Sequence, residues 1–228
     1  MFKSAYNQSD FLDHLTEIEL EKIKDQSVYT TYQDNQMIFY QGAMPFGVFI
    51  LKKGKVKLYK TGSLGKNQIF QICVPGDIFG FHAAINNYQY PDSAETLEAS
   101  EIQFIPKHLF IELIKNSSIL SFSLIQSLSN EFRKLIDQET MLSQKNVRER
   151  TALTLHILND IFKTDNKNST ITLSRNDLAD LCGTVKETLV RTLNEFKTKN
   201  YIKSVNKRDI EITNPKALKA IYSNENNP

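Results

Sequence analysis

The side chains best suited to site chemistry are Lys186, Glu187, Val190 and Arg191, near the C-terminus. Their spacing places them on one face of a helix. Guanidinium and ammonium groups donate to O6 and N7 of guanine, and a carboxylate accepts from the N4 amino group of cytosine. An ordinary helical hairpin with solvated charges is the alternative, but it requires no such set of groups within one turn. The pattern therefore predicts a helix that reads base edges in DNA.

Two short helices joined by a tight turn are needed to position these side chains. Ser174 is expected to cap the first helix, with Asp177 three residues later, and Thr184 with Glu187 repeats the arrangement at the second helix. Apolar residues at helical spacing are expected to pack the two helices together: Leu178 and Leu181 in the first, and Val185, Leu189, Leu193 and Phe196 in the second. This organisation is typical of a helix-turn-helix.

The charge around this segment also suits DNA. Residues from 146 onward carry a net charge of +4, whereas residues 1–145 carry −2. Within residues 174–208 there are 8 Lys and Arg against 4 Asp and Glu, so the surplus lies at the helix-turn-helix. Residues 201–213 predict a two-stranded wing, and its Lys203, Lys207 and Arg208 are expected to contact phosphate.

Bulk properties narrow the class of protein. The 228 residues, 40% of them hydrophobic, suit two modest domains. A mean hydropathy of −0.37, the lack of any long apolar run and the lack of a leader predict a cytoplasmic protein outside the membrane. Two distant cysteines, Cys73 and Cys182, exclude a disulfide scaffold, a zinc site and a four-cysteine iron–sulfur cluster. The sequence shows no glycine-rich phosphate loop, no paired catalytic carboxylates and no Ser-His-Asp context. It therefore gives no indication of an enzyme.

Glycine divides the chain into zones, because seven of its eight glycines precede residue 81. Between them lie seven β-like runs: Val28 to Tyr32, Met37 to Tyr40, Val48 to Leu51, Val56 to Tyr59, Gln68 to Val74, Ala94 to Leu97 and Ile102 to Ile105. Strands separated by turns at intervals of about ten residues favour a sandwich or jelly roll, here called the β-roll. A helix from Asp10 to Ile23 is expected before it.

A long helix is predicted after Ser118. Its apolar residues follow a heptad pattern at Ile125, Leu128, Phe132, Leu135 and Leu142, with Glu139 at the missing position. Such a helix is expected to pair with a second copy, and packing onto the β-roll is the alternative. Asn146 and Glu149 form a new capping box, which predicts a domain boundary there and a separate helix over residues 150–162. The fold class is therefore α+β, with a β-roll over 1–116, a dimerisation helix over 117–145 and a DNA-binding domain over 146–228.

The whole chain, over about residues 10–215, resembles the Crp/Fnr family of bacterial transcription regulators. The most specific match is the segment Arg175-Asn176-Asp177-Leu178-Ala179 through Gly183 to Glu187-Thr188-Leu189-Val190-Arg191. Supporting matches are Ile38-Phe39-Tyr40-Gln41-Gly42, Lys53-Gly54-Lys55-Val56-Lys57-Leu58 and Pro75-Gly76-Asp77-Ile78-Phe79-Gly80. The resemblance implies a homodimer, a sensor β-roll, a winged helix-turn-helix that binds palindromic double-stranded DNA, and RNA polymerase as a partner.

By the same resemblance, individual residues acquire expected roles. Glu187 and Arg191 would read the bases of the half-site core, with Lys186 as a third reader and Val190 beside them. Ser174 and Arg175 would hold phosphate at the start of the first helix, and Thr188 would contact phosphate from the second. Lys186 and Val190 depart from the residues of well-known members, so the resemblance does not assign the outer bases of the half-site.

The sensor departs from the pattern of members that bind cyclic AMP. Phe81 takes the place of their Glu and Asp92 that of their Arg, before Ser93. A carboxylate repels a phosphate, so cyclic AMP is not the expected effector. Leu135 and Ile136 stand where those members offer hydroxyls to adenine.

Three ways of controlling the activity of the protein therefore remain open. An apolar pocket is one, with Phe79, Phe81, Tyr88, Tyr90, Leu135 and Ile136 as its expected lining. Heme ligation by His82 is another, against a histidine with a structural role, and the protein acting without a ligand is a third. The competing functions are a cyclic-nucleotide regulatory subunit and a DNA-binding protein without sequence specificity.

Overall fold

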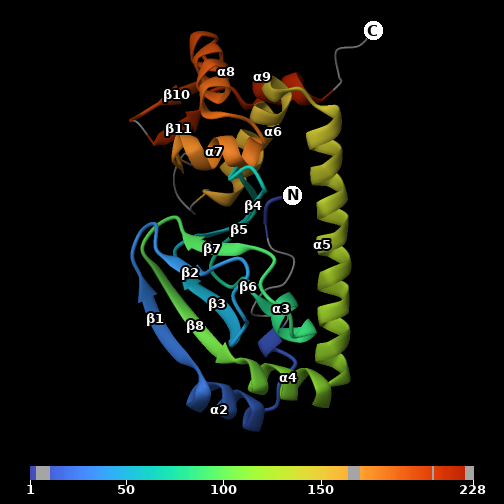
Figure 1. Ribbon diagram of the computed structural model, residues 1–228. Helices are drawn as coiled ribbons and strands as arrows, with labels where there is room; N and C mark the ends of the chain where they lie inside the picture. The colour runs from blue at the N-terminus through green and yellow to red at the C-terminus, as the bar shows by residue number, and fades with distance from the viewer. Residues whose placement is uncertain (4–10, 164–169, 207, 224–228) are drawn as a thin grey trace. The chain divides into compact units, whose positions relative to one another are not determined.

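The computed structural model describes residues 1–3, 11–163, 170–206 and 208–223. These residues divide into two compact units (Figure 1). One unit comprises residues 2–135, and the other comprises residues 136–228 with Met1. The division falls within the long helix α5 (Ser118–Gln144). The boundaries expected at residues 116 and 145 therefore stay predictions.

Two four-stranded antiparallel sheets form the β-roll of the first unit (Figure 1). The first has the order β1-β8-β3-β6 and the second β2-β7-β4-β5. Their bounds are β1 (Val28–Tyr32), β2 (Met37–Phe39), β3 (Gly47–Lys53), β4 (Val56–Thr61), β5 (Asn67–Cys73), β6 (Ile78–Phe79), β7 (Ser93–Thr96) and β8 (Ser100–Pro106). The predicted sandwich is confirmed, and β6 is an additional two-residue strand that the sequence did not reveal.

The apolar run of β3 is explained by burial on both faces of its sheet. Val48 and Ile50 belong to a core cluster shared with α4 (Lys107–Asn116) and the start of α5. Phe49 and Leu51 alternate with them and belong to a second cluster, shared with strands of the opposite sheet. Because successive side chains of a strand point to opposite faces, one strand joins both cores.

The N-terminal helix differs from the expected span of residues 10–23. The structure places α2 at Glu17–Gln26, and Thr16 is its N-cap. The Thr16 amide donates to Glu19 Oε2 at 2.8 Å, and the Glu19 amide donates back to Thr16 Oγ1 at 3.4 Å. This capping box starts a new helix, so the expected single helix was wrong. A further short helix, α3 (Phe81–Asn86), follows β6.

The second unit holds the predicted helix-turn-helix and wing. Its elements after α5 are α6 (Val147–Ile161), β9 (Thr170–Thr172), α7 (Arg175–Cys182), α8 (Lys186–Thr198), β10 (Ile202–Ser204), β11 (Asp209–Ile212) and α9 (Pro215–Tyr222). The Asn146 capping box is confirmed, because the Glu149 amide donates to Asn146 Oδ1 at 3.1 Å and the Asn146 amide to Glu149 Oε2 at 2.8 Å. The wing has three strands in the order β10-β11-β9, one more than expected.

Asp77 closes the turn between β5 and β6. The Val74 amide donates to Asp77 Oδ2 at 2.8 Å, and the side chain is almost fully buried. This burial raises the pKa of Asp77 to about 6, although the hydrogen bond from Val74 and the charges of Lys3 and Lys134 act in the opposite direction. The folded protein therefore holds a proton at Asp77 that the unfolded chain releases at lower pH.

Replacing Asp77 by Asn should stabilise the protein at neutral pH. Because the folded pKa is raised, the stability linked to protonation is full below about pH 4 and is lost as the pH rises through about 6. We expect Asp77→Asn to increase the free energy of unfolding at pH 7 by up to about 3 kcal/mol and to change it little at pH 4. Urea unfolding at both pH values measures this, with the exposed Asp13→Asn as control. An equal effect at both pH values would contradict the assignment.

Candidate DNA interface

The first helix of the helix-turn-helix begins as the sequence predicts. The Asp177 amide donates to Ser174 Oγ at 3.0 Å, and Ser174 Oγ donates to Asp177 Oδ2 at 2.5 Å. The helix ends at Gly183, whose φ of 60° lies in the left-handed region that glycine adopts readily. The Thr184 amide then donates to Ala179 O at 3.1 Å and closes the turn. The predicted cap at Ser174 is confirmed.

The start of the second helix differs from the prediction. Val185, and not Thr184, is the N-cap of α8, and no side chain caps it. The helix therefore starts one residue later than a Thr184 cap requires, and Glu187 cannot complete a capping box with Thr184. Val185 is 45% exposed, because an N-cap residue lies outside the packed stripe. The other stripe residues are buried as predicted, at Leu189, Leu193 and Phe196.

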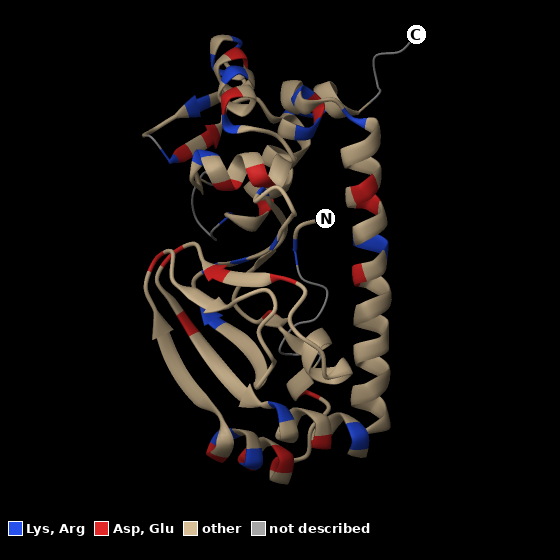
Figure 2. Ribbon diagram, viewed as in Figure 1, with Lys and Arg blue, Asp and Glu red and all other residues tan. Residues whose placement is uncertain are grey.

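The predicted base readers lie on the surface of α8. Lys186, Glu187 and Arg191 are exposed, and Val190 is partly buried beside them. Among the described residues, none of these three charged side chains forms an ion pair. Figure 2 marks the charged positions along α8. Their hydrogen-bonding groups are therefore available to a ligand outside the chain. Thr188, the predicted phosphate contact on the same helix, is partly buried.

A hollow of about 760 Å³ brings together residues from α7, α8 and the wing. Its lining comprises Ser174, Arg175, Asn176, Lys186, Val190, Lys197, Ser204, Asn206 and Arg208. Four of these side chains are cationic and none is a carboxylate, so the hollow is suited to phosphate oxygens. Sequence reasoning missed Asn176, Lys197, Ser204 and Asn206. The helical spacing of Lys197 from Lys186 and Val190 is the signal that identifies it.

One arginine of this hollow, Arg175, is held by the backbone of the wing. Arg175 Nη1 donates to Arg208 O at 3.3 Å, and burial lowers the pKa of the Arg175 guanidinium. Asn206 Oδ1 accepts from the amides of Arg208 and Asp209 at 2.8 and 2.9 Å, which fixes the wing turn. Lys203 Nζ lies 2.8 Å from Glu211 Oε2, so this predicted phosphate contact has a partner across the wing. Lys207 lies outside the described residues.

Arg150 holds the turn between the two helices, and no pattern in the sequence indicated this role. Its Nε donates to Cys182 O at 2.8 Å and its Nη2 to Gly183 O at 3.2 Å. Its Nη1 donates to Lys145 O at 2.8 Å. These carbonyls lie at the C-terminal ends of α7 and α5, where backbone acceptors have no partner within the helix. One guanidinium therefore joins α5, α6 and the helix-turn-helix.

Three of the predicted sensor residues are core residues: Phe79, Phe81 and Tyr90. Phe79 and Phe81 are almost fully buried, and they belong to different core clusters of the β-roll. Their side chains therefore stabilise the fold. Tyr90 is also buried, and its hydroxyl donates to Gly47 O at 3.2 Å, whereas Tyr88 is exposed. Leu135 and Ile136 are exposed on α5.

His82 and Asp92 form a pair at the place where the family resemblance puts the phosphate site. His82 Nε2 lies 3.2 Å from Asp92 Oδ1, and the Asp92 side chain is almost fully buried. The other carboxylate oxygen, Oδ2, is buried and has no hydrogen-bond partner among the described residues. Ser93 Oγ accepts from the Gln41 amide at 2.9 Å. A second anion beside this carboxylate would be repelled, so these residues do not fit the phosphate of a cyclic nucleotide.

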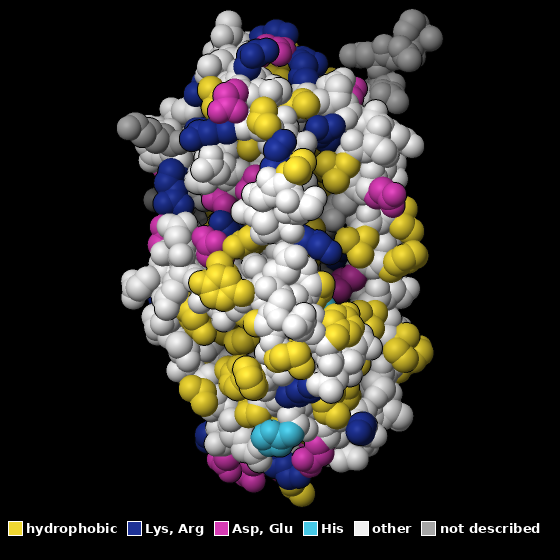
Figure 3. All heavy atoms as spheres, viewed as in Figure 1, with side chains coloured by type: hydrophobic (Ala, Val, Ile, Leu, Met, Phe, Trp, Pro, Cys, Tyr) yellow, Lys and Arg dark blue, Asp and Glu magenta, His cyan; other side chains and the backbone are white. Residues whose placement is uncertain are grey.

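The predicted heptad residues of α5 lie mostly on its solvent-facing side. Ile125 is 61% exposed and Phe132 67%, and Leu128 and Leu135 are also exposed. Figure 3 shows hydrophobic side chains along this helix. Leu120 and Leu124 lie on another face of the same helix, and they are buried in the core cluster that includes α4. Helix α5 therefore packs one face onto the β-roll and leaves its heptad face uncovered, and the expected pairing with a second copy stays a prediction.

Comparisons with known proteins agree with this architecture. Residues 29–117 match the cyclic nucleotide-binding domain family, and residues 149–221 match the Crp-like helix-turn-helix domain family. The fumarate and nitrate reduction regulatory protein of Yersinia pestis is 30% identical over 84% of this chain and 77% of its own length. The protein of the same name from Vibrio cholerae is 30% identical over 88% of this chain and 81% of its own length.

Solved structures have the same fold. FixK2 from Bradyrhizobium japonicum is 22% identical with a TM-score of 0.76, and covers 86% of this chain and 96% of its own. A regulator from Eubacterium rectale is 16% identical with a TM-score of 0.77, and covers 92% and 96%. Fold and site together define a DNA-binding transcription regulator with a winged helix-turn-helix. The chain belongs to the Crp/Fnr family.

Two further searches cover only the described residues. None of the helices there is long and apolar enough to span a membrane. No group of three or more His, Cys, Asp or Glu side chains in that part of the chain is arranged to hold a metal ion.

Replacing Arg150 by Met should weaken binding to every DNA sequence by a similar factor. The substitution keeps an unbranched apolar stem but removes the hydrogen bonds to Lys145, Cys182 and Gly183. Because hydrogen bonds to charged groups contribute about 1.5–3 kcal/mol, we expect the free energy of unfolding to fall by about 2–3 kcal/mol.

Arg148→Met is the matched control on the same helix. Arg148 Nε lies 2.9 Å from Glu195 Oε1 at the surface, so its loss should cost less than about 1 kcal/mol. Urea unfolding and fluorescence anisotropy with labelled DNA measure both quantities. Equal effects of the two substitutions would show that Arg150 does not fix the turn.

Proposed function

We propose that this regulator acts as a homodimer that reads a palindromic DNA site, under the control of a signal other than cyclic AMP. The observation that carries the proposal is the convergence of Arg175, Lys186 and Arg208 in one hollow, beside the exposed Glu187 and Arg191 of α8. A cationic hollow next to unpaired polar groups on a helix matches the two kinds of contact that a DNA reader makes.

The side chains of α8 divide by chemistry. Arg191 donates two parallel hydrogen bonds to a guanine, and Glu187 accepts from the N4 amino group of a cytosine. Lys186 contacts a third base, and Val190 contacts the apolar edge beside them. Phosphate oxygens bind Arg175 and Arg208 in the hollow, the N-terminus of α7 at Ser174, and Thr188. Lys203 contacts phosphate when its ion pair with Glu211 is broken.

The uncovered heptad face of α5 supports the dimer. Large apolar side chains at Ile125, Leu128, Phe132 and Leu135 gain from burial against a second helix at roughly 25 cal/mol per Å² of apolar surface. A two-fold protein places its two reading helices about one helical turn of DNA apart, so half-sites separate by about 10 base pairs. RNA polymerase is the expected partner at the promoter.

Arg191→Ala should relax the choice of base at one position of each half-site. We expect a loss of about 1–3 kcal/mol against the selected guanine, and a much smaller loss on DNA that carries another base there. The DNA site is obtained by in vitro selection from random sequences, and affinities are measured by anisotropy at fixed salt.

Arg208→Ala is the matched control for Arg191→Ala. A phosphate contact should weaken all sequences alike and lower the dependence of affinity on salt. If Arg191→Ala behaves in this same way, Arg191 is a phosphate contact and not a base reader. Equal affinity of the wild-type protein for selected and scrambled DNA would refute sequence-specific regulation.

Leu128→Asp should abolish dimer formation and binding to the palindrome together. The substitution places a carboxylate in the apolar face of α5 but leaves the monomer's core untouched, since Leu128 is exposed. Analytical ultracentrifugation gives the oligomeric state, and anisotropy gives DNA binding. The neighbouring exposed Ser129→Asp is the control and should change neither. A monomeric wild-type protein at micromolar concentration would remove the basis for this proposal.

A further inference from the structure

A second hollow lies in the first unit, at the open edge of the β-roll. Strand β1 is the edge of one sheet and β2 is the edge of the other, and they pair with β8 and β7 and not with each other. The sandwich therefore stays open between these two strands. A cleft of about 530 Å³ occupies this opening, which is within the usual size range of small-molecule sites.

The floor of the cleft consists of aromatic rings packed on one another. Phe39 stacks on Tyr90 with ring centroids 3.9 Å apart, and on Phe49 at 5.6 Å. Phe49 in turn contacts Phe104 at 5.4 Å. Gly47 permits this packing, because a Cβ atom there would overlap the Phe104 ring and the Ile105 carbonyl. The floor is thus closely packed.

The mouth of the cleft is apolar and exposed. Phe46 is 80% exposed and Val28 55%, and Tyr40 and Met44 are exposed beside them. Large apolar side chains gathered around a concave surface mark binding sites, because water contact there is unfavourable. None of the twelve described residues that line the cleft carries a charge. A charged nucleotide would find no counter-charge in it.

Four side-chain hydroxyl groups belong to the lining, those of Thr30, Tyr32, Tyr40 and Tyr90, and the Tyr90 hydroxyl already donates to Gly47 O. Thr30 and Tyr32 lie on the same face of β1, since alternate residues of a strand share a face. Burial raises the pKa of Tyr32, so its phenol stays neutral at physiological pH. An occupant of this cleft therefore needs an apolar body and few hydrogen-bonding groups.

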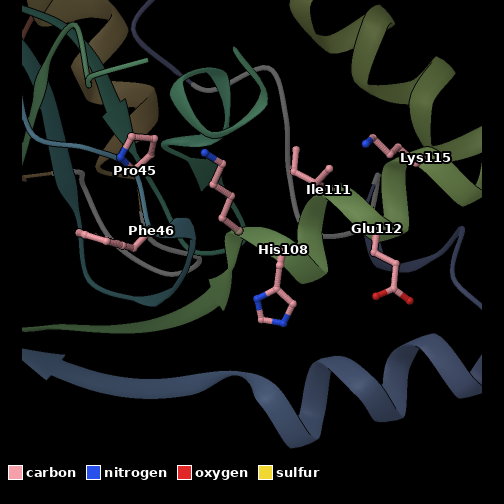
Figure 4. Close-up of a pocket in the computed structure, with 7 residues that line it drawn as sticks. Pro45, Phe46, His108, Ile111, Glu112 and Lys115 are labelled. Carbon is pink, nitrogen blue, oxygen red and sulfur yellow. The ribbon is translucent and has the colours of Figure 1, made fainter. Parts of the chain in front are cut away.

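A neighbouring hollow shows what a charged site looks like on the same unit. It lies between the loop at Pro45 and Phe46 and helix α4, and it shares Phe46 with the cleft (Figure 4). Lys107, His108, Glu112 and Lys115 line it, so it favours polar or anionic groups. The uncharged lining of the edge cleft is therefore a distinct chemical environment, close to a charged one.

We propose that the cleft between β1 and β2 binds a small, uncharged aromatic molecule. Among the described residues expected from the sequence to form an effector pocket, only Tyr90 lines this cleft, and His82 and Asp92 do not, so the cleft is distinct from the site of His82 and Asp92. The proposal does not depend on the DNA-reading function.

The test uses N-phenyl-1-naphthylamine, an uncharged aromatic fluorophore, with the full-length protein. We expect saturable binding with an increase in fluorescence. Thr30→Lys should weaken it at least about tenfold, because an uncharged ligand would take the new ammonium group out of water. Ala43→Phe, which fills the cleft from the loop, should weaken it as well. Thermal unfolding checks that each variant is folded.

Thr31→Lys is the matched control, since Thr31 is the adjacent exposed threonine of β1 and does not line the cleft. It should bind the probe as the wild-type protein does. The sulfonated analogue 1-anilinonaphthalene-8-sulfonate should bind less tightly at this site, because no cation there pairs with its sulfonate. Absence of saturable binding, or equal affinities of the Thr30 and Thr31 variants, would overturn the proposal. The latter result would place the probe elsewhere, as on the apolar face of α5.

Discussion

The DNA-binding unit depends on how the carbonyl ends of its helices are satisfied. Helices α5 and α7 both end near α6. Their last carbonyl groups receive no hydrogen bond from an N–H group of their own helix. Arg150 supplies donors to Lys145, Cys182 and Gly183 from one planar group. Because a guanidinium has five N–H donors in a fixed geometry, these bonds constrain direction as well as distance. Gly183 is the C-cap of α7 and α8 begins at Lys186, so these bonds hold one end of the turn between the two helices.

Charge is distributed differently in the two units. The hollow beside α8 concentrates Arg175, Lys186, Lys197 and Arg208 without a carboxylate in its lining. The sensor unit instead buries a carboxylate, Asp92, beside His82. The first arrangement attracts phosphate, and the second repels it. The two units therefore differ in the charge that they present to a phosphate.

The β-roll combines a closed core with an open edge. Strand β3 is buried on both faces and joins the two core clusters, whereas the edge strands β1 and β2 leave a gap with an aromatic floor. A jelly roll does not remove its edges as a closed barrel does. Such a gap exposes apolar side chains around a concave surface, which makes it a candidate binding site.

The sequence alone determined the elements whose signals are local. The β-like runs between glycine turns located seven strands of the β-roll, the caps at Ser174 and Asn146 fixed two helix starts, and heptad spacing identified the exposed face of α5. Residue chemistry on one helix face singled out Lys186, Glu187 and Arg191. These features depend on neighbours within a few residues, so the order of residues carries them.

Only the tertiary structure decided what depends on contacts between distant segments. It assigned Arg150 to the turn at Gly183, added β9 to the wing, and moved Phe79 and Phe81 into separate cores. It also placed β1 and β2 beside the same cleft, as edge strands that do not pair with each other. No spacing along the chain reports such contacts, because they arise from how sheets and helices pack. The cap at Thr184 failed for a related reason, since the packing of α8 set its first residue at Lys186.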